Sequence, residues 1–218
     1  MSGRSAEDPQ HRRIHPFERL HLAYGPGRRR RVLCERFVSR IPQAATVLDV
    51  GCGDGAILSH LAALRSDVES AGIDVRVRPN AAISVEAYDG VTIPHDDGAF
   101  DVVLLVDVLH HCDDPERTLR EAARVAGGCV LVKDHVPNGP FGSRLLRFMD
   151  DVANRRVGLN PVPLEDYWQE ERWLEIVDRC GLVVEAWSDR IHLYPRPIDW
   201  VFGRSLHFVA ELRASTSS

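Results

Sequence analysis

The chain has 218 residues, of which 44% are hydrophobic and 27% charged, and its formal charge is −5. This composition excludes a disordered, collagen-like or coiled-coil chain, and no run approaches the roughly 18 apolar residues of a membrane-spanning helix. The first ten residues lack the apolar segment of a signal peptide. The negative balance gives no general attraction to nucleic acids or anionic membranes. We therefore expect a single-domain, cytoplasmic protein.

Cysteine usage points to the same compartment. The five cysteines are scattered and never form a Cys-x-x-Cys pair. A disulfide framework or a zinc ribbon is therefore disfavoured, and reduced thiols are expected. The cysteines are Cys34, Cys52, Cys112, Cys129 and Cys180.

Hydrophobic periodicity alternates between helical and extended spacing along the chain. Such alternation predicts an α/β fold with a mainly parallel sheet, in which ligands lie beyond the carboxyl ends of the strands. The expected helices cover residues 28–40, 56–64, 115–126, 140–156 and 165–180, with Gly127-Gly128 ending the third. The expected strands cover residues 46–50, 69–75, 83–87, 99–106, 129–133, 182–186 and 205–212.

A glycine-rich turn follows the first strand, within residues 47–55. Gly51 and Gly53 would let the backbone approach a ligand, and the positive end of the next helix would point there. The dinucleotide pattern Gly-x-Gly-x-x-Gly is not met, because the third glycine comes one residue early, at Gly55. Asp49 would also repel a pyrophosphate. The turn therefore favours a positively charged ligand over NAD.

Two acidic residues follow the next strands. Asp74 ends the second strand, where a carboxylate accepts hydrogen bonds from both ribose hydroxyls in nucleotide-binding α/β folds. Asp89, followed by Gly90, comes after the third strand and could accept from an adenine amine. The Asp-Gly pair is also typical of a type I′ turn, and the sequence leaves both readings open.

Residues 46–133 resemble class I S-adenosylmethionine-dependent methyltransferases, in segments 47–55, 72–75, 89–94, 100–111 and 114–125. The resemblance implies a Rossmann-like, seven-stranded, mainly parallel sheet with helices on both faces. It also implies an antiparallel last strand and a helical cap inserted after the fifth strand. S-adenosylmethionine would be the cofactor and S-adenosylhomocysteine its product. The implied cofactor-binding residues are Asp49 (near the methionine amine), Gly51, Cys52, Gly53, Asp74, Val75, Asp89, Gly90 and Asp107.

Candidate catalytic residues follow the fourth and fifth strands. The sulfonium already activates the methyl group, so a base is needed only if the acceptor must lose a proton. His135 is the first choice, because it opens the variable region and histidine titrates near neutrality. A structural role or a metal site is the alternative, but adjacent histidines cannot both point inward from regular structure, and we expect no metal. The full set is Asp107, His110, His111, Asp134 and His135.

The region 136–204 should select the acceptor, which we expect to be a small, partly apolar molecule methylated at oxygen, nitrogen or carbon. The only basic run, residues 28–31, is expected to be solvated or turned to the cofactor carboxylate, which disfavours a nucleic-acid acceptor. A non-catalytic cofactor-binding protein stays open, and a homodimer is compatible with the sequence. The candidate substrate-binding residues are Phe148, Met149, Asn154, Tyr167, Trp168, His192 and Tyr194.

We expect one domain with four parts. Residues 1–27 form an N-terminal lid or tail, and residues 28–135 form the cofactor-binding core. Residues 136–181 form the helical cap over the substrate, and residues 182–212 form the final strands and a late loop.

Overall fold

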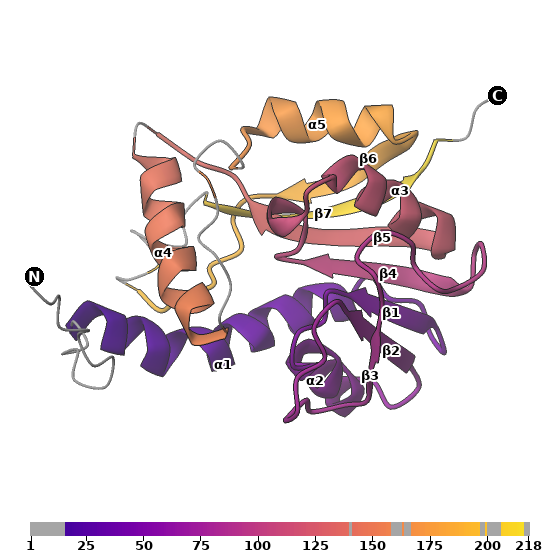
Figure 1. The fold of residues 1–218 in the computed structure, drawn as a ribbon, viewed down its shortest axis with the longest axis horizontal. Helices are drawn as coiled ribbons and strands as arrows, with labels where there is room; N and C mark the ends of the chain where they lie inside the picture. Colours follow the sequence, from indigo (N-terminus) through magenta and orange to yellow (C-terminus); the bar gives the residue numbers. More distant parts are fainter. Residues whose placement is uncertain are drawn as a thin grey trace, which may run out of the picture.

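A computed structural model describes residues 16–139, 141–157, 163, 167–196, 199 and 206–215. Its strands form one seven-stranded sheet in the order β3-β2-β1-β4-β5-β7-β6 (Figure 1). β7 is antiparallel to both of its neighbours, and the pairs on the other side of β5 are parallel. The predicted fold class is thus confirmed. The strands are β1 (Thr46–Val50), β2 (Glu69–Asp74), β3 (Val85–Ala87), β4 (Phe100–Val106), β5 (Ala126–His135), β6 (Leu182–Ser188) and β7 (His207–Ala214).

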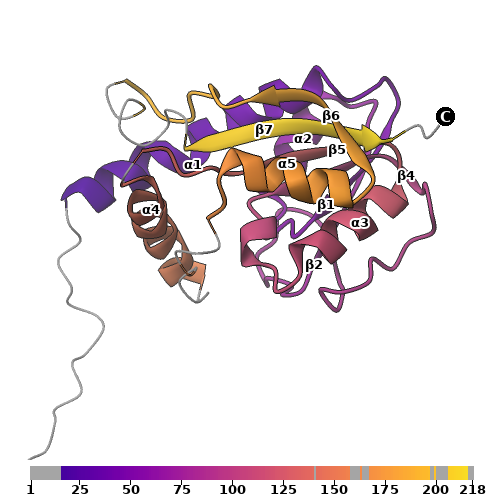
Figure 2. The same ribbon diagram turned by 90° about the horizontal axis from the view of Figure 1, so that it is seen from above.

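Helices cover both faces of the sheet. Helices α1 and α2 lie on one face and α3 and α5 on the other, while α4 stands beside α1 beyond the end of the sheet (Figures 1 and 2). In the described part of the chain, no helix combines the length and apolarity needed to cross a membrane. The helices are α1 (Pro16–Val38), α2 (Ala56–Leu64), α3 (Pro115–Val125), α4 (Gly142–Val157) and α5 (Glu170–Arg179), with a short 3-10 turn at Leu109–His111.

The central strand β4 shows why the sequence has an almost continuous apolar run there. Val102 and Leu104 pack in the core beneath α1 and α2, whereas Val103 and Leu105 pack in the core beneath α3 and α5. All four side chains are completely buried. A strand covered on both faces needs apolar side chains in both directions, so alternation with polar residues is lost.

Several element boundaries differ from the prediction. Helix α1 begins at Pro16 rather than at residue 28, because proline is tolerated in the first turn of a helix. Strand β5 runs through Gly127-Gly128, which was expected to be a break. A Cβ on Gly128 would lie 2.5 Å from the carbonyl oxygen of Asp101, so glycine there permits close strand contact. Helix α5 begins at Glu170 rather than 165, and β7 spans 207–214 rather than 205–212.

Helix α3 begins at Pro115, as the sequence predicts, and Asp114 caps it. The Asp114 carboxylate accepts a hydrogen bond of 2.9 Å from the Arg117 amide, and Pro115 is the first helical residue. The cap satisfies an amide that the helix leaves free, and proline has no amide to satisfy. The expectation of unpaired cysteines is also met, since all five are free.

The glycine turn between β1 and α2 has positive φ at Gly51 (71°), Gly53 (62°) and Gly55 (70°). The amides of Gly51 and Cys52 both donate to the Ile73 carbonyl, at 2.9 and 3.1 Å. A Cβ on Gly51 would lie 2.6 Å from Val108, whereas one on Gly53 would meet only the end of the Arg78 side chain, at 3.4 Å. Gly51 is thus required by packing as well as by its backbone conformation.

Alanine substitutions separate these two requirements. Left-handed backbone costs alanine about 1–2 kcal/mol, and overpacking adds about 1–3 kcal/mol. We expect Gly53→Ala to lower the free energy of unfolding by about 1–2 kcal/mol and Gly51→Ala by about 2–5 kcal/mol. Urea denaturation measures both. Val108→Ala should recover part of the Gly51→Ala loss, and equal losses for the two single variants would contradict the packing argument.

Candidate active site

Asp49 lies on β1 directly before the glycine turn and is only 1% exposed. Its Oδ1 atom is buried and has no hydrogen-bond partner among the described residues. Burial, with a contribution from nearby Asp74, raises the pKa of Asp49 to about 8. A buried acceptor without a donor is costly, so the site fits a ligand that brings a charged N–H group to this oxygen.

Asp74 shapes the turn next to Asp49. One carboxylate oxygen accepts from the Gly53 amide and the other from the Arg76 amide, both at 2.8 Å. The side chain thus joins the end of β2 to the glycine turn. Each oxygen keeps a second lone pair, so the predicted role as a ribose acceptor stays available to it.

Asp89, Gly90 and Val75 lie at the outer edge of this half of the site. Asp89 is exposed, and one of its oxygens accepts from the amides of Val91 and Thr92, both at 2.8 Å, which lowers the pKa of its carboxyl. A Cβ on Gly90, whose φ is 78°, would lie 2.9 Å from Val75, and Val75 is 63% exposed. The carboxylate therefore builds a local turn beside an exposed apolar side chain.

Cys52 lies within the glycine turn and is 8% exposed. Burial raises the pKa of its thiol to about 12. Cys52 is therefore a neutral part of the turn, and it limits the space beside Gly72, where a Cβ would lie 2.8 Å from its sulfur.

Asp107 begins a second half of the site, just beyond β4. Its backbone has φ of 57°, and its carboxylate accepts from Arg29 of α1 and from Lys133 of β5. Lys133, the only lysine of the chain, is completely buried, and its Nζ also lies 3.2 Å from Nδ1 of His207 on β7. The basic run 28–31 is thus not simply solvated, because Arg29 turns inward to Asp107.

Sequence reasoning did not assign Arg29, Lys133 or His207 to the site. The available signal for Lys133 was its place in β5, directly before two candidate catalytic residues. A charged residue inside an otherwise apolar strand needs a partner, because an unpaired buried charge is expensive.

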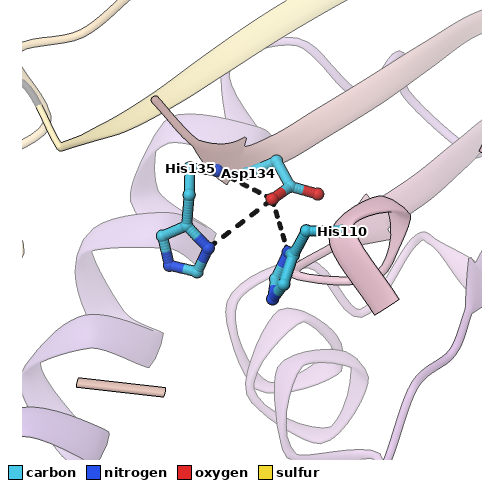
Figure 3. A group of neighbouring side chains, drawn as sticks. All are labelled: His110, Asp134 and His135. Atoms are coloured by element: carbon cyan, nitrogen blue, oxygen red, sulfur yellow. Dashed lines mark hydrogen bonds and ion pairs between the residues drawn. The ribbon is translucent and has the colours of Figure 1, made fainter. Parts of the chain in front are cut away.

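His110, Asp134 and His135 meet where β4 and β5 end, and all three are buried (Figure 3). Oδ1 of Asp134 lies 2.6 Å from Nδ1 of His110 and 3.6 Å from Nδ1 of His135, and it accepts from the His135 amide at 2.7 Å. Burial opposes ionisation of Asp134, but His110 and Lys133 outweigh it and lower the pKa of its carboxyl. Burial, followed by Lys133 and His110, holds the pKa of His135 far below its usual value, so His135 is neutral.

Asp150 approaches the same histidines from α4. Its Oδ2 accepts a hydrogen bond from the Tyr167 hydroxyl and lies 3.8 Å from Nε2 of His110. Its Oδ1 lies 3.9 Å from Nε2 of His135. Burial raises the pKa of Asp150. The segment after β5 thus places Tyr167, a predicted substrate-binding residue, beside a carboxylate that was not among the predicted site residues.

The remaining predicted residues around this cluster lie in different surroundings. His111 is exposed, with its ring centroid 4.1 Å from that of His110. Met149 is buried in the core, and Phe148, on the same helix, is 48% exposed. Trp168 packs against Trp173, at 4.9 Å between ring centroids, in the core beneath α3 and α5.

The two predicted substrate-binding residues of the late loop, Tyr194 and His192, lie in different environments. Tyr194 is buried, with its ring 6.3 Å from that of His207. His192 is exposed, has φ of 48°, and its Nδ1 lies 2.7 Å from the buried Asp199 carboxylate. Asn154 lies in α4, but its side chain is outside the described residues.

His110, Asp134 and His135 carry side chains of the kinds that bind metal ions, so their spacing can be compared with that of a metal site. One ligand atom from each lies within 4.8 Å of the others. The 2.6 Å contact between Asp134 and His110 is a hydrogen-bond distance. Two ligands held about 2.0 Å from a tetrahedral ion lie about 3.3 Å apart. The geometry therefore favours a proton between these two residues over a shared ion.

A family model described as "Methyltransferase domain" matches residues 26–186. The chain belongs to this family. It is 30% identical over 156 residues to ajmaline N-methyltransferase of Rauvolfia serpentina, covering 65% of this chain and 46% of the relative. It is 31% identical over 187 residues to 27-O-demethylrifamycin SV methyltransferase of Amycolatopsis mediterranei (strain S699), covering 76% of this chain and 64% of the relative.

The chain therefore spans about half to two-thirds of the length of these two relatives. Among solved structures, a SAM-dependent methyltransferase from Aquifex aeolicus has a TM-score of 0.61 at 19% identity, covering 92% of this chain and 98% of that one. The family match confirms the class I S-adenosylmethionine-dependent methyltransferase resemblance. The cofactor of this family is S-adenosylmethionine, which carries an ammonium group on its methionine part. Such a group is the kind of charged donor that the buried Oδ1 of Asp49 lacks among the described residues.

The raised pKa of Asp49 predicts a pH-dependent stability of the protein without ligand. Since folded Asp49 binds its proton more tightly than the unfolded chain does, stability is greatest below about pH 4 and is lost as the pH rises towards about 8. Relative to Asp49→Asn, the free energy of unfolding of the wild type should fall by up to about 1.4 kcal/mol per pH unit in this window. Urea denaturation from about pH 5 to about pH 8 measures it.

Glu69→Gln, on the neighbouring strand and exposed, is the matched control and should follow the wild-type profile. Parallel profiles for the wild type and Asp49→Asn would show that Asp49 is ionised without ligand and would refute the prediction.

Proposed function

We propose that this protein transfers the methyl group of S-adenosylmethionine to an oxygen, nitrogen or carbon of a small, partly apolar acceptor. The proposal rests on one observation: a turn with a buried carboxylate oxygen that no described residue hydrogen-bonds adjoins a buried cluster of histidines and carboxylates. Both lie at the carboxyl ends of neighbouring parallel strands, where ligands of such sheets bind. Two relatives, ajmaline N-methyltransferase and 27-O-demethylrifamycin SV methyltransferase, support a small-molecule acceptor by what their names say they act on.

The cofactor half would consist of the residues around the glycine turn. Asp49 would accept a hydrogen bond from the methionine amine, and Asp74 would accept from the ribose hydroxyls. Asp89, Gly90 and Val75 would border the adenine. When bound, the cofactor supplies an electrophilic methyl group on a sulfonium, so the protein chiefly has to orient the acceptor for in-line attack.

The acceptor half would receive the proton that the acceptor loses. The sequence favoured His135 as the base, but the contacts support His110 better. Asp134 holds Nδ1 of His110 at 2.6 Å and thereby directs Nε2 towards the space beside Asp150. His135, which burial and the nearby Lys133 keep neutral, would line the site and accept a hydrogen bond. Asp150 and Tyr167 would bring the cap region 136–181 into contact with the acceptor.

Calorimetric titration tests the cofactor assignment. S-adenosylhomocysteine and S-adenosylmethionine should bind to the wild type, and NAD should not. Asp74→Ala should weaken binding about 10–100-fold, because it removes hydrogen bonds to a charged acceptor. Glu69→Gln, at the other end of the same strand, should retain wild-type affinity. A folded wild type that binds neither methionine derivative would refute the proposal.

Turnover tests the base, with any acceptor that consumes methyl donor in a panel of phenols, amines and related compounds. His110→Ala should lower turnover about 10²–10⁴-fold while S-adenosylhomocysteine affinity stays near that of the wild type. His111→Ala, its exposed neighbour, is the control and should have a small effect. A larger turnover loss in His135→Ala than in His110→Ala would return the role to His135, and loss of cofactor affinity would exclude a role as base.

A further inference from the structure

We infer that the reacting group of the acceptor is an amine, which enters as an ammonium ion between the carboxylate of Asp150 and the Nε2 atoms of His110 and His135. The inference rests on the proposed function and specifies its substrate class. It is carried by the position of Asp150, to which no arginine or lysine among the described residues is bound, and by the two histidine nitrogens that face it.

Among the described residues, no arginine or lysine is bound to Asp150. Arg29 and Lys133 both bind Asp107 instead. Burial raises the pKa of the Asp150 carboxyl, because the charged form is costly in a buried site without a partner. A cationic ligand beside Asp150 would offset that cost.

The hydrogen-bond pattern locates that cation. Asp134 holds Nδ1 of His110 at 2.6 Å, and Nε2 of His110 and of His135 face Asp150 at 3.8 and 3.9 Å. With an Nδ1 proton directed to Asp134, a neutral His110 offers Nε2 as an acceptor, and the Asp150 oxygens accept as well. These separations exceed a hydrogen bond, and acceptors facing one another call for a donor between them.

The donors available from the chain are few. In the described part of the structure, the hydrogen bond to Asp150 comes from Tyr167 alone, and it reaches Oδ2. Nδ1 of His135 and Oδ2 of Asp134 are buried without a hydrogen-bond partner in the same region. An ammonium group brings two or three N–H donors and a positive charge. A hydroxyl brings one donor and no charge, and would leave Asp150 uncompensated.

The chemistry of the step follows from these contacts. The ammonium group gives one proton to Nε2 of His110, whose imidazolium is stabilised by Asp134. The freed nitrogen lone pair forms a bond to the methyl carbon, the carbon–sulfur bond breaks, and its electron pair stays on sulfur. The products are the N-methylammonium and S-adenosylhomocysteine, with the transferred proton on His110. Atoms and charge balance without a metal or a redox partner.

Sinefungin tests the inference without knowledge of the acceptor, because it carries an amine where S-adenosylmethionine carries its methylated sulfonium. The readout is the Kd of S-adenosylhomocysteine divided by the Kd of sinefungin, measured by calorimetry, so that a general loss of cofactor affinity cancels. We expect a ratio of at least about 10 for the wild type, which corresponds to one further charge-assisted hydrogen bond.

Asp150→Asn should bring this ratio down to about 1, because the amide keeps the shape of the side chain and removes its charge. Asp151→Asn, the next residue of α4, is the matched control and should keep the wild-type ratio. If Asp150→Asn fails to fold, the wild-type ratio by itself still decides the inference. A wild-type ratio of 1 or less, or a ratio that survives in Asp150→Asn, overturns the inference.

Compared with a failure of the amine assignment, a failure of the proposed function gives a different result. In that case neither S-adenosylhomocysteine nor sinefungin binds to the folded wild type. Binding of S-adenosylhomocysteine without a preference for sinefungin leaves the methyltransferase proposal standing and removes only the amine assignment.

Discussion

The carboxylate of Asp107 connects elements that lie far apart in the sequence. It accepts from Arg29 of α1 and from Lys133 of β5, and Lys133 in turn reaches His207 at the start of β7. The backbone amide of Asp107 also donates to the Lys133 carbonyl at 2.8 Å. A fully buried lysine is tolerable only with such partners. The position of α1 over the sheet and the alignment of β7 against β5 are therefore tied to one carboxyl group.

This arrangement explains why the two halves of the site differ in character. The glycine turn satisfies its backbone groups through Ile73 and Asp74 and leaves one carboxylate oxygen, on Asp49, for a ligand. The other half gathers histidines and carboxylates around Asp134, with the cations drawn to one side by Asp107. Ionisable groups in low dielectric interact strongly. The histidines are consequently held in defined orientations before any acceptor arrives.

The sequence was sufficient for the fold and for the position of the glycine turn, because both depend on local patterns. Strand–turn–helix spacing predicted the turn around Gly51, and Asp74 was expected at the end of the neighbouring strand, where the structure has it. The buried cluster was only partly predictable. Asp107, His110, Asp134 and His135 follow strands that end at one edge, so their meeting could be expected. Arg29, Asp150 and His207 reach the cluster through tertiary packing, and one sequence contains no periodic signal for that.

The predicted start of β5 is wrong because the prediction has Gly127 and Gly128 end the preceding helix and lie outside the strand. Glycine pairs usually end a regular element, but here the lack of a Cβ lets β5 pass close to the backbone of β4 near Asp101. The meaning of the glycines depends on a neighbouring strand and cannot be read from the segment itself.

Asp150 and Tyr167 belong to the segment between β5 and β6, whereas the groups around the glycine turn belong to residues 49–90. The two sets share no residue, and the strands that join them are held by the buried core. Under the proposed function, changes in the segment after β5 would alter which molecule is accepted without rebuilding the glycine turn. A division of this kind would let one scaffold acquire new acceptors by local replacement, and it makes helix α4 the place to begin redesigning specificity.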